Sequence, residues 1–220
     1  MAEGKSDASP HAQFRGIASS ESPAARHLRA RTAWVTQHQP GLMGLVKRSP
    51  IWHRDYQRQE YLTSDLSTCL FASTANGARD LRLAVPGGFE ARAGADPRLR
   101  SFFQAGQGSY LLSPEGTSAY AQFAQEQIPG LRVTALPSPV GLDVVIHRLN
   151  LHLPTIVFIG EGSHAIELNG VTTNGSNLVF GVVDPLKGRY ETLSLQDLVG
   201  KQLGVDAQGL LRTIGLSRVR

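Results

Sequence analysis

Residues 154–198 read PTIVFIGEGSHAIELNGVTTNGSNLVFGVVDPLKGRYETLSLQDL. This stretch contains four short apolar segments, and turn signals at Asn174-Gly175 and Lys187-Gly188 separate the last three. Such a pattern is typical of an antiparallel β-meander. We expect strands over residues 154–160, 163–171, 178–183 and 189–193, and then a short capped helix over 194–198.

The residues before this meander have helical periodicity instead. Four apolar residues between positions 142 and 149 are spaced i, i+3, i+4 and i+7, which predicts an amphipathic helix. Helices that precede a run of antiparallel strands indicate the α+β class. The other expected elements are helices over 67–82, capped by Ser67, and 113–127, a strand over 131–136 and a loop over 84–98.

Composition excludes several classes of protein. Hydrophobic residues make up 41% of the 220 positions, which suits a packed core rather than wholesale disorder. The one cysteine, Cys69, excludes an internal disulfide framework and a zinc site built on several cysteines. No apolar run approaches the ~18 residues of a membrane-spanning helix, and no motif suggests a metal or another cofactor. We therefore expect neither a cofactor nor a membrane span.

The net charge of +4 belongs to the front of the chain. Residues 1–60 contain nine Lys or Arg and five Asp or Glu, and the rest contain thirteen of each. A neutral main domain argues against nucleic-acid binding. Ser, Ala, Gly and Pro dominate the start, so we expect a disordered tail over 1–32, a transitional segment over 33–58 that docks on the core, and a folded domain over 59–220. Pro40 and Pro50 predict that no single long helix spans the transitional segment.

Two side chains of the meander are candidates for an acid–base pair. If the hairpin has the three-residue loop Thr173-Asn174-Gly175, His164 lies directly opposite Asp184. Opposed side chains on one face are about 4.5–5.5 Å apart at Cβ, so Asp184 could orient the imidazole. A two-residue loop would instead place the two side chains on opposite faces.

Cys69 falls in the first turn of the helix expected over residues 67–82. The helix macrodipole favours a thiolate at that position. A cysteine at a helix start together with a distant His–Asp pair has the logic of a thiol hydrolase, in which His164 activates Cys69 and Asp184 holds His164. The plainer interpretations are a buried filler cysteine and an Asp-Pro turn.

The segments GSHAIELNGV (162–171) and VVDP (182–185), with the Gly188 turn that follows, resemble the C-terminal half of papain-like cysteine peptidases. The similarity is to the bacteriocin-leader peptidases and to related papain-like effectors secreted by bacterial pathogens, and it covers roughly residues 60–200. It implies a papain-like α+β fold, in which a helical half with the nucleophile helix packs on a twisted antiparallel sheet. The catalytic residues implied are Cys69, His164 and Asp184.

The resemblance also implies acyl transfer from a peptide or isopeptide bond of a protein or peptide substrate, through a thioester and without a cofactor. The family usually has a Gln about six residues before the cysteine to complete the oxyanion hole. Thr63 occupies that position here, so Gln59 is the nearest candidate. Alternatives are a deamidase or transglutaminase of the same fold, or an inactive protein-binding module.

The N-terminus lacks the apolar region of a Sec-type signal peptide. Together with the resemblance, this predicts a protein made in the bacterial cytoplasm and delivered out of the cell or into a host cell. The sequence carries no signal for an oligomeric state.

Overall fold

The computed structural model describes residues 23–47, 61–63, 66–104, 114–160, 163–201, 203–204, 210 and 212–219. Its helices are α1 (Pro23–Met43), α2 (Cys69–Asp80), α3 (Phe89–Ala95), α4 (Arg100–Gln104), α6 (Pro114–Gln127), α7 (Leu142–Asn150) and α8 (Leu195–Gly200), with a 3-10 turn at Pro97–Leu99. Its strands are β1 (Tyr61–Thr63), β2 (Leu66–Ser67), β3 (Leu131–Ala135), β4 (Thr155–Ile159), β5 (His164–Asn174), β6 (Asn177–Asp184), β7 (Arg189–Ser194) and β8 (Ile214–Arg218).

Six of the strands form one antiparallel sheet in the order β3-β8-β4-β5-β6-β7. Strands β4 to β7 are the expected meander, and the α+β class is confirmed. The sequence did not predict β8, which lies between β3 and β4 and joins the helical half of the chain to the meander. Strands β1 and β2 pair with each other as a separate two-stranded sheet.

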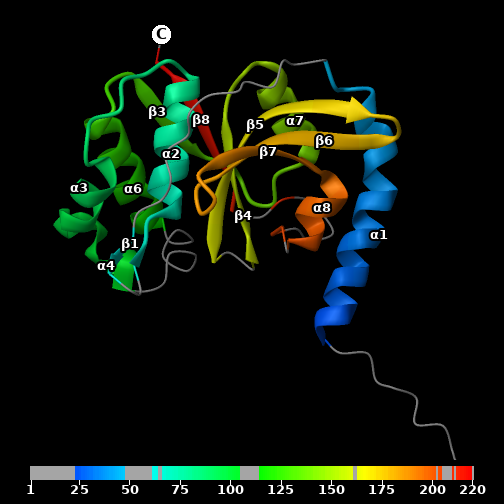
Figure 1. The fold of residues 1–220 in the computed structure, drawn as a ribbon, viewed down its shortest axis with the longest axis horizontal. Coiled ribbons are helices and arrows are strands. Elements are labelled where there is room, and N and C mark those ends of the chain that lie inside the picture. Colours follow the sequence, from blue (N-terminus) through cyan, green and yellow to red (C-terminus); the bar gives the residue numbers. More distant parts are fainter. Residues whose placement is uncertain are drawn as a thin grey trace, which may run out of the picture.

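Helices cover both faces of the six-stranded sheet, so the sheet separates two hydrophobic cores. Helices α2, α3, α4 and α6 gather on one side, and α1, α7 and α8 lie on the other (Figure 1). Neighbouring residues of β5 alternate between the cores: Ala165 packs with the α2 side, whereas Ile166 packs with the α7 side. Alternation of this kind is the period-2 geometry of a strand that is buried on both faces.

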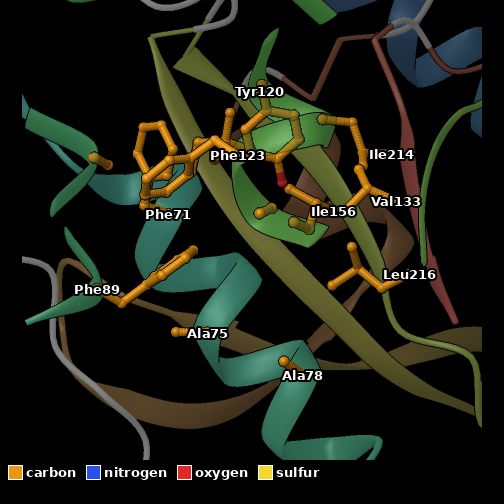
Figure 2. Close-up of a cluster of buried hydrophobic side chains, with 14 of the residues drawn as sticks. Phe71, Ala75, Ala78, Phe89, Tyr120, Phe123, Val133, Ile156, Ile214 and Leu216 are labelled. Atoms are coloured by element: carbon orange, nitrogen blue, oxygen red, sulfur yellow. The ribbon is translucent and has the colours of Figure 1, made fainter. Parts of the chain in front are cut away.

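The core on the α2 side is rich in aromatic side chains (Figure 2). Phe71 lies at its centre, two residues after Cys69, and has no exposed surface. Full burial of one such side chain contributes about 1.5–3 kcal/mol to stability, so this core anchors the first turn of α2. The rings within 5.4–6.2 Å of the Phe71 ring centroid belong to Phe89, Phe102, Phe103, Tyr120 and Phe123.

Helix α1 belongs to the second core. Trp34 is 6% exposed and Val35 is 3% exposed, and Gln39 donates from Nε2 to the backbone oxygen of Ser176 at 2.8 Å. The structure therefore differs from the expected disorder up to residue 32, because α1 already begins at Pro23. Pro40 lies inside α1, in its last turn, and the helix ends three residues later at Met43.

Two expectations for the α2 region need correction. Helix α2 begins at Cys69, with Thr68 as N-cap, and Ser67 belongs to β2 instead of capping the helix. The expected loop over 84–98 contains α3, which starts directly after Gly88. Gly88 has φ 68°, a left-handed conformation that suits glycine.

Among the described helices, none is both long enough and apolar enough to cross a membrane.

Candidate active site

Cys69 is the first residue of α2 and is 1% exposed. The preceding Thr68 directs its Oγ1 to a carboxylate oxygen of Glu90 and not to the first turn of α2. The first N–H groups of a helix have no acceptor within the helix, and the macrodipole is positive at that end. The sulfur of Cys69 thus lies at the positive end of α2.

The backbone of Ala165, in β5, contacts α2 twice. Its N–H donates to Sγ of Cys69 with an N–S distance of 3.3 Å, and its carbonyl oxygen accepts from Oγ of Ser73 at 3.2 Å. A buried N–H that donates to the sulfur favours negative charge there. Sequence reasoning missed this contact because a backbone donor leaves no trace in the residue type. Since His164 precedes Ala165 directly, the same contacts bring His164 beside Cys69.

His164 bonds to both of its expected partners. Its Nε2 lies 2.8 Å from Oδ1 of Asp184, and the imidazole also interacts with the side chain of Cys69. Burial lowers the pKa of the imidazole, but hydrogen bonds with Asp184 and Cys69 and the charges of both groups outweigh burial and raise the pKa of His164 to about 9. His164 is therefore an imidazolium at neutral pH, held between two groups that favour its positive charge.

Asp184 ends β6 and is fixed by the turn that follows. Its Oδ1 also accepts from the N–H of Leu186 at 3.0 Å, and its carbonyl oxygen accepts from the N–H groups of Lys187 and Gly188. Burial raises the pKa of Asp184, but hydrogen bonding and charge from His164, the Leu186 N–H and the charge of Lys187 together lower it. The carboxylate is therefore ionised and rigidly oriented toward His164.

The register of the β5–β6 hairpin differs from the expected one. Asn174 pairs with Asn177, so the loop consists of Gly175 and Ser176, which is the two-residue alternative and not the three-residue loop. Gly175 has φ 58°, a left-handed conformation that two-residue hairpin loops require. A two-residue loop was expected to place His164 and Asp184 on opposite faces of the sheet.

A β-bulge reconciles this loop with the observed His164–Asp184 contact. Near the loop, the register alone would place His164 and Asp184 on opposite faces of the sheet. Strand β5 has one extra residue, Asn169, between two successive partner pairs. A shift of one residue exchanges the faces of a strand, so beyond the bulge both side chains lie on the same face.

The structure therefore brings Cys69, His164 and Asp184 together from a helix start and two adjacent strands. Gln59, the expected oxyanion donor, lies outside the described residues. Within the described part of the chain, no group of three or more His, Cys, Asp or Glu is placed to hold a metal ion.

Comparison of this chain with protein-family models, with curated proteins and with solved structures found no match.

Proposed function

We propose that this protein is a cysteine-dependent hydrolase of papain-like design that cleaves a peptide or isopeptide bond. The observation that supports the proposal best is the continuous contact from Asp184 through His164 to Cys69, at the start of a helix. A nucleophile, a base and a group that orients the base, within hydrogen-bond reach of one another, are the signature of nucleophilic catalysis.

In the proposed reaction, the Cys69 thiolate attacks the carbonyl carbon of the scissile bond. The tetrahedral oxyanion accepts from the backbone N–H of Cys69, and the imidazolium of His164 donates its proton to the leaving amine as the C–N bond breaks. His164 then removes a proton from water, which attacks the thioester, and the carboxylic acid leaves with Cys69 regenerated. Asp184 keeps the imidazole oriented throughout.

Two alternatives use the same fold. A deamidase or transglutaminase would share every step up to the thioester, and the acceptor that resolves it would differ. A protein-binding module would need no reactive sulfur, and the 1% exposure of Cys69 favours that alternative over the others. The reactivity of Cys69 distinguishes the enzymatic alternatives from the protein-binding module.

The test is the rate of Cys69 alkylation by iodoacetamide between pH 4 and pH 9. Labelling is unambiguous because the chain has one cysteine. We expect fast labelling at pH 6, which is well below the pKa of ~8.5 of an ordinary cysteine thiol. Labelling of His164→Ala should be at least about tenfold slower. His147→Ala, which changes an exposed histidine of α7, is the matched control and should label like the wild type.

Suppose that labelling is slow in both the wild type and His164→Ala, with the pH dependence of an ordinary thiol. This result would exclude an activated nucleophile and favour the binding module. If labelling is fast, a quenched peptide library and a free amine acceptor then separate hydrolysis from transfer. Cys69→Ser should abolish either reaction.

A further inference from the structure

A partly buried polar contact joins the far end of α2 to the bulge in β5. Asn169, the extra residue of the bulge, donates from Nδ2 to Oδ2 of Asp80 at 2.8 Å. Asp80 is the last residue of α2, and Asn169 is 4% exposed. A buried amide destabilises a fold unless it is hydrogen-bonded. The bulged residue is therefore held against the nucleophile helix by its own side chain.

A second side chain of β5 lies near the same carboxylate. Glu167 is fully buried, and burial, followed by the charge of Asp80, raises its pKa well above the usual range. Both effects favour the neutral form of Glu167. Tyr190, in β7, faces the same charge: burial and Asp80 raise the pKa of Tyr190 to about 12. Asn169 thus binds the carboxylate near which Glu167 and Tyr190 lie.

The contact lies where it controls the geometry of the catalytic residues. Asp80 is eleven residues from Cys69, about 16 Å along the helix axis. Ala165 and Ser73 bind β5 to α2 near Cys69, and Asn169 and Asp80 bind it at the opposite end. The bulge lies at the second attachment, and it sets which face of the sheet the side chains between the two attachments occupy relative to β6.

We propose that Asp80 and Asn169 are positioning residues of the candidate active site. Their hydrogen bond fixes the bulge, and the bulge places His164 and Asp184 on one face of the sheet. The consequence for catalysis rests on the proposed function, whereas the consequence for the His164–Asp184 contact does not. A purely structural hydrogen bond would contribute to stability and leave that contact unchanged.

The test is an NMR titration of the His164 imidazole. Its signal is assigned as the one that disappears in His164→Ala. Asn169→Asp should place two carboxyl groups face to face, release the bulge and lower the titration midpoint from about 9 toward the ~6.5 of a free imidazole. The double variant Asp80→Asn/Asn169→Asp restores a donor and an acceptor with their positions exchanged. It should return the midpoint to near the wild-type value.

A second single variant guards against loss of folding. Asp80 is only half-buried, so Asp80→Ala admits solvent to the Asn169 amide, and it should also lower the midpoint. Thr74→Val is the matched control: Thr74 is a buried residue of α2 that bonds to Tyr120 and not to the bulge. It should reduce stability without moving the midpoint.

An unchanged midpoint in folded Asn169→Asp or Asp80→Ala would overturn the positioning role, as would a double variant that fails to restore the titration. The readout does not depend on turnover. The two proposals can also fail separately. If the His164 midpoint responds as expected but Cys69 labels like an ordinary thiol, the positioning role stands and the proposed function is wrong.

Discussion

At the scale of single residues, the hydrogen bond with Asp184 is the strongest of the interactions that favour the protonated form of His164. The folded-state pKa of His164 is raised to about 9, so its contribution to stability is fully present below ~6.5 and disappears as the pH rises through 9. Asp184→Asn should therefore lower the free energy of unfolding by about 1–3 kcal/mol at pH 6, and by less at pH 10. Urea unfolding at the two pH values checks this, and an equal loss at both would contradict it.

Glu167 has the opposite effect on stability at neutral pH. Its pKa is raised by burial and by Asp80, so the folded state is most favoured below ~4.3, and each pH unit above that costs about 1.4 kcal/mol until the folded-state pKa is reached. Glu167→Gln keeps the shape and cannot ionise. It should match the wild type at pH 4 and be more stable at pH 8 by about 1 kcal/mol or more.

Urea unfolding at pH 4, 6 and 8 measures the difference between Glu167→Gln and the wild type. Glu115→Gln, at an exposed position in the first turn of α6, is the control. A stability difference that does not change with pH would show that Glu167 keeps its charge in the folded protein.

At the scale of elements, α2 approaches the sheet so closely that one position has no room for a side chain. A Cβ on Gly77 would lie 2.5 Å from Cδ1 of Leu216 and 3.2 Å from Cβ of Pro154. Gly77→Ala gains about 1 kcal/mol of helix propensity, but overpacking costs about 1–3 kcal/mol. We expect a net loss of about 1 kcal/mol, measured as a lower urea midpoint.

Gly41→Ala in α1 should change stability in the opposite direction, because nothing lies within 4 Å of a Cβ added at this position. It should stabilise the protein by up to about 1 kcal/mol. If both variants shift stability in the same direction, α2 and the sheet are not in the close contact described.

Local signals explain which elements could be predicted from the sequence. The spacing of apolar residues predicted α7, and Ser194 with Asp197 forms a capping box that starts α8 as expected. The hairpin register could not be predicted, because it depends on a loop choice and on a bulge that is held by Asp80, 89 residues away in the chain. Residue types sufficed to select Cys69, His164 and Asp184, but not the route by which they meet.

At the scale of the whole molecule, long-range contacts decide what the sequence left open. Strand β8 pairs with β3 and β4, and nothing in its five residues predicts that position. Likewise, the first residues of α1 have a composition that favours disorder. Helix α1 nevertheless docks, because Trp34 and Val35 enter the second core. Packing against α8 and β6 overrides the local preference.

The last prediction tests whether α1 is part of the cooperative fold. Trp34 is 6% exposed, and removal of a buried aromatic side chain costs about 3–5 kcal/mol. Trp34→Ala should therefore lower the unfolding midpoint strongly, in one transition, whereas Arg26→Ala at an exposed position of the same helix should not. Because the sheet separates the second core from the Cys69 side, iodoacetamide labelling under native conditions should persist in Trp34→Ala. A midpoint equal to that of Arg26→Ala would mean that α1 rests on the domain without contributing to its stability.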